Sequence, residues 1–121
     1  MFRLRKANKY CKWFWDESLG GEFDAWGTST YFMEIGDNSH VVRQIEVYEN
    51  GNVLFYDSSH ISDDYGMLCD RVIGEDDIRD FEITKEEFEQ VWNTKTPTNR
   101  EILLIIISIN YEIYCCQISV Y

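Results

Sequence analysis

Residues Val41 to Asp57 read VVRQIEVYENGNVLFYD and show the clearest structural pattern of the chain. From Val41 to Tyr48, successive side chains alternate between two faces, and a second run of this kind follows Asn50-Gly51. Alternation with a period of two is typical of strands. Asn and Gly tolerate positive φ angles, and Asn-Gly between two such runs is the strongest short-range signal of a hairpin. This segment therefore predicts a β-hairpin.

Two more strands are predicted on the N-terminal side of the hairpin. They are residues Tyr10 to Trp15 (YCKWFW) and Tyr31 to Ile35, each followed by a turn that contains glycine. Aromatic and β-branched runs with such boundaries are typical of strands. The lysines beside the first run are compatible with a platform for single-stranded nucleic acid, but the acidic chain would repel phosphates. We therefore expect a core strand that buries Trp13, Trp15 or both.

A helix is predicted from Lys85 to about Asn93. Thr84 and Glu87 have the spacing of a capping box, in which each side chain accepts a hydrogen bond from the amide of the other residue. Apolar residues three and four positions apart would turn one face of this helix toward the core, namely Phe88, Val91 and Trp92. Residues 58–80 are polar and predict an ordered loop with one short helical turn.

The chain has 121 residues, of which 45% are hydrophobic and 16% aromatic. This length suits one domain with one core. We expect a single α+β domain over residues 1–121. Its antiparallel, twisted sheet would contain the central Asn-Gly hairpin, with one or two short helices packed on one face. Residues 94–121 would supply an Ile-rich C-terminal strand segment.

The C-terminal residues Ile102 to Tyr121 read ILLIIISINYEIYCCQISVY. Their dense apolar part ends before Asn110, whereas a membrane-spanning helix needs around 20 apolar residues, so we expect no membrane contact. Isoleucine favours buried strands, and sheet core is the preferred interpretation. The alternatives are an edge strand that pairs with a partner and an oligomerising strand that pairs with a second copy of the chain.

The cysteines and the N-terminus bear on the cellular location. The four cysteines include no CxxC spacing, and two of them are adjacent, which is not the pattern of a disulfide framework. The first residues lack the apolar segment and the cleavage site of a signal peptide. A reduced, cytoplasmic protein is therefore expected.

The charge of the chain is strongly negative, at −11, with 22 acidic residues against 11 lysines and arginines. This balance argues against direct binding of nucleic acid, because phosphate binding depends on clustered Lys and Arg. Between Asp57 and Glu89 there are twelve acidic residues and three basic ones. Confining this charge to one region costs self-repulsion that solubility does not require. The pattern predicts a basic protein partner, since complementary charge speeds association.

Little in the sequence suggests catalysis. The chain has two histidines and neither a zinc-binding nor a phosphate-binding motif. Clustered carboxylates can bind Mg²⁺ or Ca²⁺, so a small metal-dependent hydrolase is the alternative function. Its ligands would be Asp63, Asp64, Glu75, Asp76 and Asp77, and a metal nuclease would use Asp70 or Asp80 with Glu82 and Lys85. These spacings fit neither a calcium loop nor a carboxylate and lysine on one strand face, so we expect no metal, cofactor or catalytic residue.

Three motifs stand out together: the aromatic strand Tyr10 to Trp15, the segment Val42 to Gly51 (VRQIEVYENG), and the pattern Ile83-x4-Phe88-Glu89-x2-Trp92. In these motifs the chain resembles a small bacterial domain family of uncharacterised function, over residues 9–93. Members of that family look like immunity proteins encoded beside polymorphic toxins. The chain is similar to an immunity protein of a contact-dependent growth inhibition system.

The resemblance implies a cytoplasmic inhibitor that binds the toxic C-terminal domain of a delivered effector and covers its active site or substrate surface. Such toxins are commonly nucleases, and an RNase that cleaves tRNA is the preferred target. We expect a monomer in a 1:1 complex, without catalytic residues, because an acidic domain can mimic nucleic acid toward a basic enzyme. The predicted toxin-binding residues, with one aromatic anchor of the kind that interfaces favour, are Asp63, Asp64, Tyr65, Asp70, Glu75, Asp76, Asp77 and Asp80.

Overall fold

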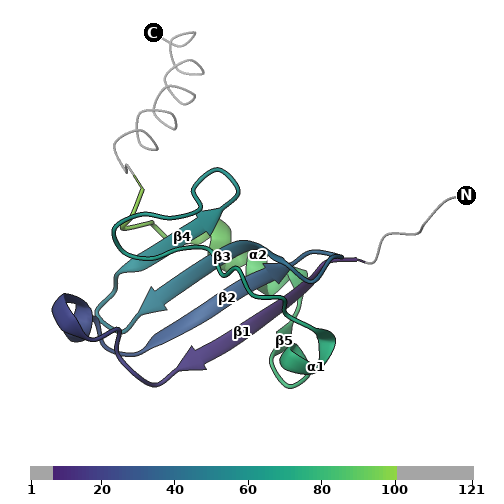
Figure 1. Ribbon diagram of the computed structural model, residues 1–121, viewed down its shortest axis with the longest axis horizontal. Coiled ribbons are helices and arrows are strands. Elements are labelled where there is room, and N and C mark those ends of the chain that lie inside the picture. The colour runs from purple at the N-terminus through teal and green to yellow at the C-terminus, as the bar shows by residue number, and fades with distance from the viewer. Residues whose placement is uncertain (1–6, 101–121) are drawn as a thin grey trace, which may run out of the picture.

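An antiparallel sheet of five strands lies at the centre of the protein, whose structure is a computed structural model that describes residues 7–100. The spatial order of the strands is β4-β3-β2-β1-β5 (Figure 1). The strands are β1 Lys9–Trp15, β2 Ser29–Ile35, β3 Val41–Tyr48, β4 Val53–Asp57 and β5 Glu82–Ile83. This sheet and the few short helices form the predicted α+β class. The predicted strand segment at 102–121 lies outside the described residues.

The strands β3 and β4 are antiparallel neighbours, with Val47 opposite Val53. In the connection between them, Gly51 has a φ of +97°, a conformation that residues with a Cβ rarely adopt. The Tyr48 N–H donates a hydrogen bond to the Asn52 carbonyl at 2.9 Å. The backbone freedom of glycine and the pairing of the two strands therefore favour the same chain reversal.

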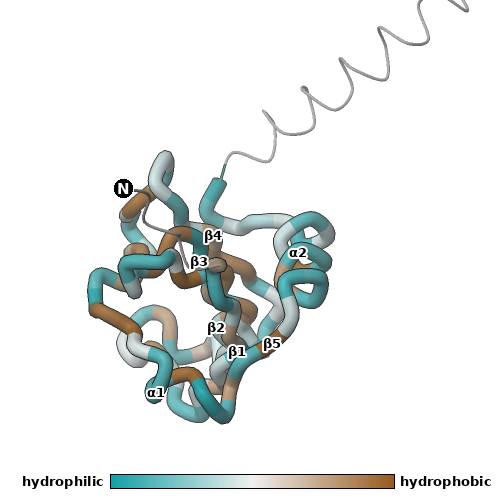
Figure 2. The backbone as a smooth tube through the Cα atoms, turned by 90° about the vertical axis from the view of Figure 1, so that its right-hand side faces the viewer, coloured by the Kyte–Doolittle hydropathy of each residue, from teal (hydrophilic) through white to brown (hydrophobic). Residues whose placement is uncertain are grey.

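The helix α2, Lys85–Thr94, packs on one face of the sheet, here called the helix face (Figure 2). The Thr84 hydroxyl accepts a hydrogen bond from the Glu87 N–H at 3.1 Å, which confirms the N-cap half of the predicted capping box. The Glu87 carboxylate lies 3.9 Å from the Lys12 amine. Phe88 is fully buried and belongs to a cluster with side chains from β1 to β4. The other members of this cluster are Tyr10, Phe32, Ile45, Val53 and Phe55.

Residues 58–80, the loop segment, cover part of the opposite face, here called the loop face, and include the short helix α1, Glu75–Ile78. Neighbouring residues of a strand point to opposite faces, so Cys11 lies on the loop face and Tyr10 on the helix face. The sequence predicted helices on one face only, and α1 departs from this. Its single buried side chain, Ile78, packs in the same cluster as Cys11.

Arg43 links the helix face of the sheet to α2. Its guanidinium bonds the carboxylates of Glu34 on β2 and Glu89 on α2. It also lies over two rings of the helix, 4.8 Å from the ring centroid of Phe88 and 4.9 Å from that of Trp92. The position of α2 on the sheet is thus stabilised by charge as well as by apolar contact.

The outer edge of β4 is covered by residues 97–100. The Val53 carbonyl accepts a hydrogen bond from the Thr98 N–H at 2.6 Å. The side-chain amide of Asn99 accepts from the Phe55 N–H at 2.9 Å and donates to the Phe55 carbonyl at 3.0 Å. These bonds occupy backbone groups that would otherwise be available to another strand. No helix within residues 7–100 combines the length and the apolar content that crossing a membrane requires.

Candidate interaction surface

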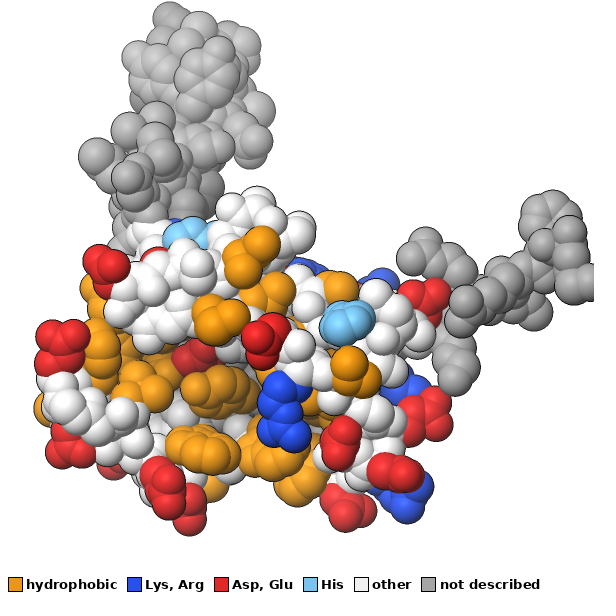
Figure 3. Space-filling view, in the orientation of Figure 1, with side chains coloured by type: hydrophobic (Ala, Val, Ile, Leu, Met, Phe, Trp, Pro, Cys, Tyr) orange, Lys and Arg blue, Asp and Glu red, His pale blue; other side chains and the backbone are white. Residues whose placement is uncertain are grey.

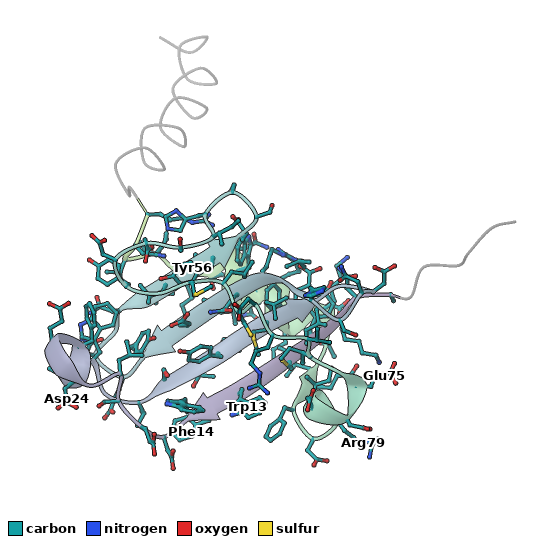
Figure 4. All side chains as sticks on the ribbon, in the orientation of Figure 1. Trp13, Phe14, Asp24, Tyr56, Glu75 and Arg79 are labelled. Atoms are coloured by element: carbon teal, nitrogen blue, oxygen red, sulfur yellow. The ribbon has the colours of Figure 1, made fainter. Side chains whose placement is uncertain are left out.

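The predicted acidic residues spread across the molecule. Asp63 lies beside β4 at one edge of the sheet, whereas residues Glu75 to Asp77 begin α1 near β5 at the other edge (Figures 1 and 4). The remaining predicted acids are exposed, and they are Asp64, Asp70 and Asp80. The acidic region that is continuous in sequence is therefore not a single cluster in space.

Asp63 belongs to the internal structure of the loop segment. Its carboxylate accepts hydrogen bonds from the Tyr56 hydroxyl at 2.8 Å, the Asn99 Nδ2 at 2.9 Å and the Tyr65 N–H at 2.9 Å. The His60 Nε2 lies 2.7 Å from it. Burial acts to raise the pKa of Asp63, but these hydrogen bonds, from His60 above all, hold the pKa below its ordinary value. Most of the hydrogen bonds that the Asp63 carboxylate can accept therefore come from within the chain.

The acids of α1 make local contacts but stay at the surface. The Asp77 carboxylate accepts a hydrogen bond from the Gly74 N–H at 2.8 Å, and Asp76 pairs with Arg79. The Asp76 side chain is nevertheless 86% exposed. The predicted anchor Tyr65 packs against two aromatic rings of the connection between β1 and β2, so only part of its ring remains accessible.

A groove of about 230 Å³ opens on the loop face beside β1 and β2. This aromatic groove is lined by Trp13, Trp15, Tyr31, Met33, Cys69, Arg71 and Ile73. Figure 3 shows hydrophobic side chains gathered on this part of the loop face, with acidic side chains around its rim. None of these seven residues is among the partner-binding residues predicted from the sequence.

The exposure of the groove corrects the expectation that β1 is a core strand. Tyr10 and Cys11 are buried, but neither tryptophan is: Trp13 is half-buried and Trp15 is 46% exposed, next to Phe14 at 60%. The clusters that cover the two faces of the sheet include Tyr10 and Cys11, and neither of them reaches Phe14 or Trp15. The local sequence does not distinguish the buried from the exposed half of β1, since an aromatic run has the same pattern in a core and on a surface.

A buried carboxylate lies behind the groove. Glu46 on β3 is 4% exposed and accepts hydrogen bonds from the Tyr48 hydroxyl and the Gln44 amide, while its burial raises its pKa. Burial and the charge of Glu46 raise the pKa of Tyr31 to about 12. Gln44 also accepts a hydrogen bond from the Cys69 N–H at 2.8 Å. Two groove residues, Tyr31 and Cys69, are thus positioned by one polar network.

The residues considered for metal chemistry are dispersed. Within residues 7–100, no three His, Cys, Asp or Glu side chains are placed to hold a metal ion. Glu82 lies on β5 and pairs with Lys9 at 3.6 Å, whereas Lys85 is the first residue of α2. Asp70 and Asp80 lie on the exposed part of the loop segment.

The arrangement is suited to binding a macromolecule. Trp, Tyr and Arg are the residue types that contribute most to affinity at protein interfaces, and the groove contains Trp13, Trp15, Tyr31 and Arg71. Polar bonds beneath the groove limit the rearrangement that binding requires. No protein-family model, curated protein or solved structure matches the chain.

Proposed function

We propose that the protein is an immunity protein that binds and neutralises a cognate basic toxin domain of contact-dependent growth inhibition. In this proposal the toxin is an RNase that cleaves tRNA, and the inhibitor covers its active site or substrate surface. The inhibitor acts in the cytoplasm as a monomer in a 1:1 complex. The observation that supports this best is the exposed aromatic groove on the surface of an acidic chain.

The apolar surface around the groove argues for a protein partner. Soluble monomers rarely expose large contiguous apolar patches unless the patch has a function. Here Trp15 is 46% exposed in the groove, and the loop segment exposes two further apolar side chains that do not line it, Met67 at 49% and Val72 at 62%. Covering these side chains would remove apolar surface from water, which favours association.

The charge of the surface indicates the chemistry of that partner. The chain has a net charge of −11, and Asp64, Asp70 and Asp80 are exposed on the loop segment. Such a surface attracts an enzyme whose own substrate is a polyanion, because that enzyme presents Lys and Arg. In this division of roles the acids speed the encounter, and the aromatic groove slows dissociation.

The test is coexpression in a bacterial host with the C-terminal domain of the exported protein encoded beside this chain. The domain alone should stop growth and cleave tRNA. Coexpression of the chain should restore growth, and the two proteins should elute together as a 1:1 complex. Persistent growth arrest without a complex would contradict the proposal, as would hydrolysis by the chain itself that depends on added Mg²⁺.

A charge variant tests the proposed role of the acids. Replacing Asp64, Asp70 and Asp80 together by Asn should slow association at low salt and leave the dissociation rate nearly unchanged. The wild type measured in high salt is the matched control, because screening should slow its association in the same way. An unchanged association rate would show that these acids do not speed the encounter with the partner.

A further inference from the structure

The two outer edges of the sheet differ in how they are covered. Side chains and backbone of residues 97–100 occupy the edge of β4. On the other side, β5 pairs with β1 only opposite Tyr10 and Cys11, and the Lys12 N–H donates to the Phe81 carbonyl at 2.9 Å. Within residues 7–100, no strand lies beyond this bond next to the C-terminal end of β1 (Figure 1).

Phe14 presents the hydrogen-bonding groups of this open edge. Alternate residues of a strand point their N–H and C=O groups to the same side. Lys12 points its N–H away from β2 and toward Phe81. Phe14, two residues later, therefore points its N–H and carbonyl to the same outer side, past the end of β5. Trp13 and Trp15 point theirs to β2, which pairs with both.

The side chains beside this edge are aromatic and accessible. Phe14 is 60% exposed on the helix face, and Trp15 is 46% exposed on the loop face. Trp13 both lines the aromatic groove and stacks on Phe81, with 5.0 Å between the ring centroids. Native proteins usually protect an open edge with charges, proline or a covering segment, and the exposed side chains of the last two residues of β1, Phe14 and Trp15, are aromatic.

Acidic side chains stand at both ends of the edge. Asp16 and Glu17 follow β1 directly and are exposed, and Asp80 and Glu82 are exposed on either side of Phe81. A second copy of the chain would add the same acids and another net charge of −11, which opposes pairing of two identical edges. A strand with basic side chains has the complementary charge.

We propose that the basic partner adds an extended strand to the outer edge of β1 at residues 13–15, in line with β5, and inserts an apolar side chain into the aromatic groove. This inference rests on the proposed function and specifies how its complex forms. The Phe14 N–H and carbonyl pair with the added strand, while the acids at the two ends of the edge contact its basic side chains. Backbone pairing supplies affinity, and the groove supplies side-chain selectivity.

Hydrogen exchange of the ¹⁵N-labelled full chain tests the backbone pairing. In the free protein the Phe14 amide should exchange rapidly, whereas the amides of Trp13 and Trp15 are bonded to β2. Adding the toxin domain should slow exchange at Phe14 by at least about tenfold, with little change at its two neighbours. A complex that forms without slowing exchange at Phe14 overturns the inference and leaves the proposed function standing.

Two variants of one residue separate the backbone from the side chain. Phe14→Ala keeps the amide proton, and Phe14→Pro removes it from a position that β2 does not use. Phe14→Pro should bind the toxin domain at least about tenfold more weakly than Phe14→Ala. Equal affinities of the two variants, at equal melting temperatures, overturn the inference. If Phe14→Pro melts at a lower temperature than Phe14→Ala, the hydrogen exchange of the wild-type Phe14 amide decides whether the strand is added.

A synthetic probe makes the test independent of the toxin. A short blocked peptide of alternating Lys and Val should slow exchange at Phe14, and the same peptide N-methylated at every residue should not. Equal effects of both peptides would mean that charge alone binds them, which contradicts strand addition. If the wild type fails to bind the toxin domain but the unmethylated peptide protects Phe14, the proposed function fails and the open edge remains a strand acceptor.

Discussion

The indole of Trp13 stacks on the ring of Phe81, with ring centroids 5.0 Å apart and ring planes at 16°. The Phe81 carbonyl also accepts the backbone hydrogen bond from Lys12. The stack therefore lies where the backbone bonding along the outer edge of β1 ends. Trp13 lines the aromatic groove at the same time. One side chain therefore joins the open edge of β1 to the groove, the two features on which the proposed interaction depends.

Asp63→Ala should lower the free energy of unfolding by about 2–4 kcal/mol, because several buried donors lose their charged acceptor. The side chains that bond this carboxylate include those of His60, Tyr56 and Asn99. Urea unfolding measures the change. The matched control is Asp64→Ala at the exposed neighbouring position, which should stay within about 0.5 kcal/mol of the wild type. Equal effects of the two substitutions would contradict a structural role for Asp63.

Glu46→Gln should change how stability depends on pH. Burial raises the pKa of Glu46 in the folded protein, so the contribution of this group to stability is fully present below its unfolded pKa, about 4.3. That contribution is lost as the pH rises through the raised pKa. Glutamine does not titrate. The unfolding free energy of the variant minus that of the wild type should therefore increase between about pH 4 and pH 7.

Urea unfolding at a series of pH values measures this difference. The matched control for the substitution is Glu86→Gln on the exposed face of α2. The free energy of unfolding of Glu46→Gln minus that of the wild type could instead stay constant or decrease with rising pH. Either result would show that burial does not disfavour the charge of Glu46.

Arg43→Met should destabilise the protein by about 2–4 kcal/mol, because Glu34 would keep a buried charge without its cation. Glu34 is 7% exposed and bonds Arg43 directly. Thermal and urea unfolding measure the loss, and the double variant Arg43→Met with Glu34→Gln should recover part of it. Arg79→Met, which breaks the exposed pair with Asp76, should cost no more than about 1 kcal/mol. No recovery in the double variant would argue against an electrostatic cause.

Asn99→Ala should uncover the edge of β4. The side chain of Asn99 bonds both the N–H and the carbonyl of Phe55, so its loss should cost about 1–3 kcal/mol. Urea unfolding measures the loss. Asn93→Ala, at an exposed position of α2, is the control, and a fully stable Asn99→Ala would contradict the role given to residues 97–100.

The parts of the fold that depend on local signals were predictable from the sequence. The helix start at Thr84 follows from the chemistry of a cap and is found in the structure. The strand predicted at 10–15 matches β1, Lys9–Trp15. The face on which α1 packs was not predictable, because it depends on where a 23-residue polar segment, residues 58–80, crosses the sheet. That path is set by contacts distant in sequence, such as the bond between Gln44 and the Cys69 N–H.

The surface was harder to predict than the fold. Asp63 and Asp64 are adjacent and chemically identical, yet one is held by a network and the other is exposed. A partial signal existed, because an Asp can accept hydrogen bonds from the backbone amides two and three residues later in a turn, as Asp63 does from Tyr65 and Gly66. The exposure of Trp15 had no such signal, since it depends on how far the segments that cover the loop face reach along β1.

The most direct measurement of the central claim is the affinity of the toxin domain for groove variants, by isothermal titration calorimetry. Trp15→Ala changes a groove residue that is 46% exposed, and Leu19→Ala changes a residue that is 41% exposed and does not line the groove. Both variants should keep the wild-type melting temperature. Trp15→Ala should bind the toxin domain at least about tenfold more weakly than the wild type, and Leu19→Ala should bind it equally well. Wild-type affinity of Trp15→Ala would contradict binding through the groove.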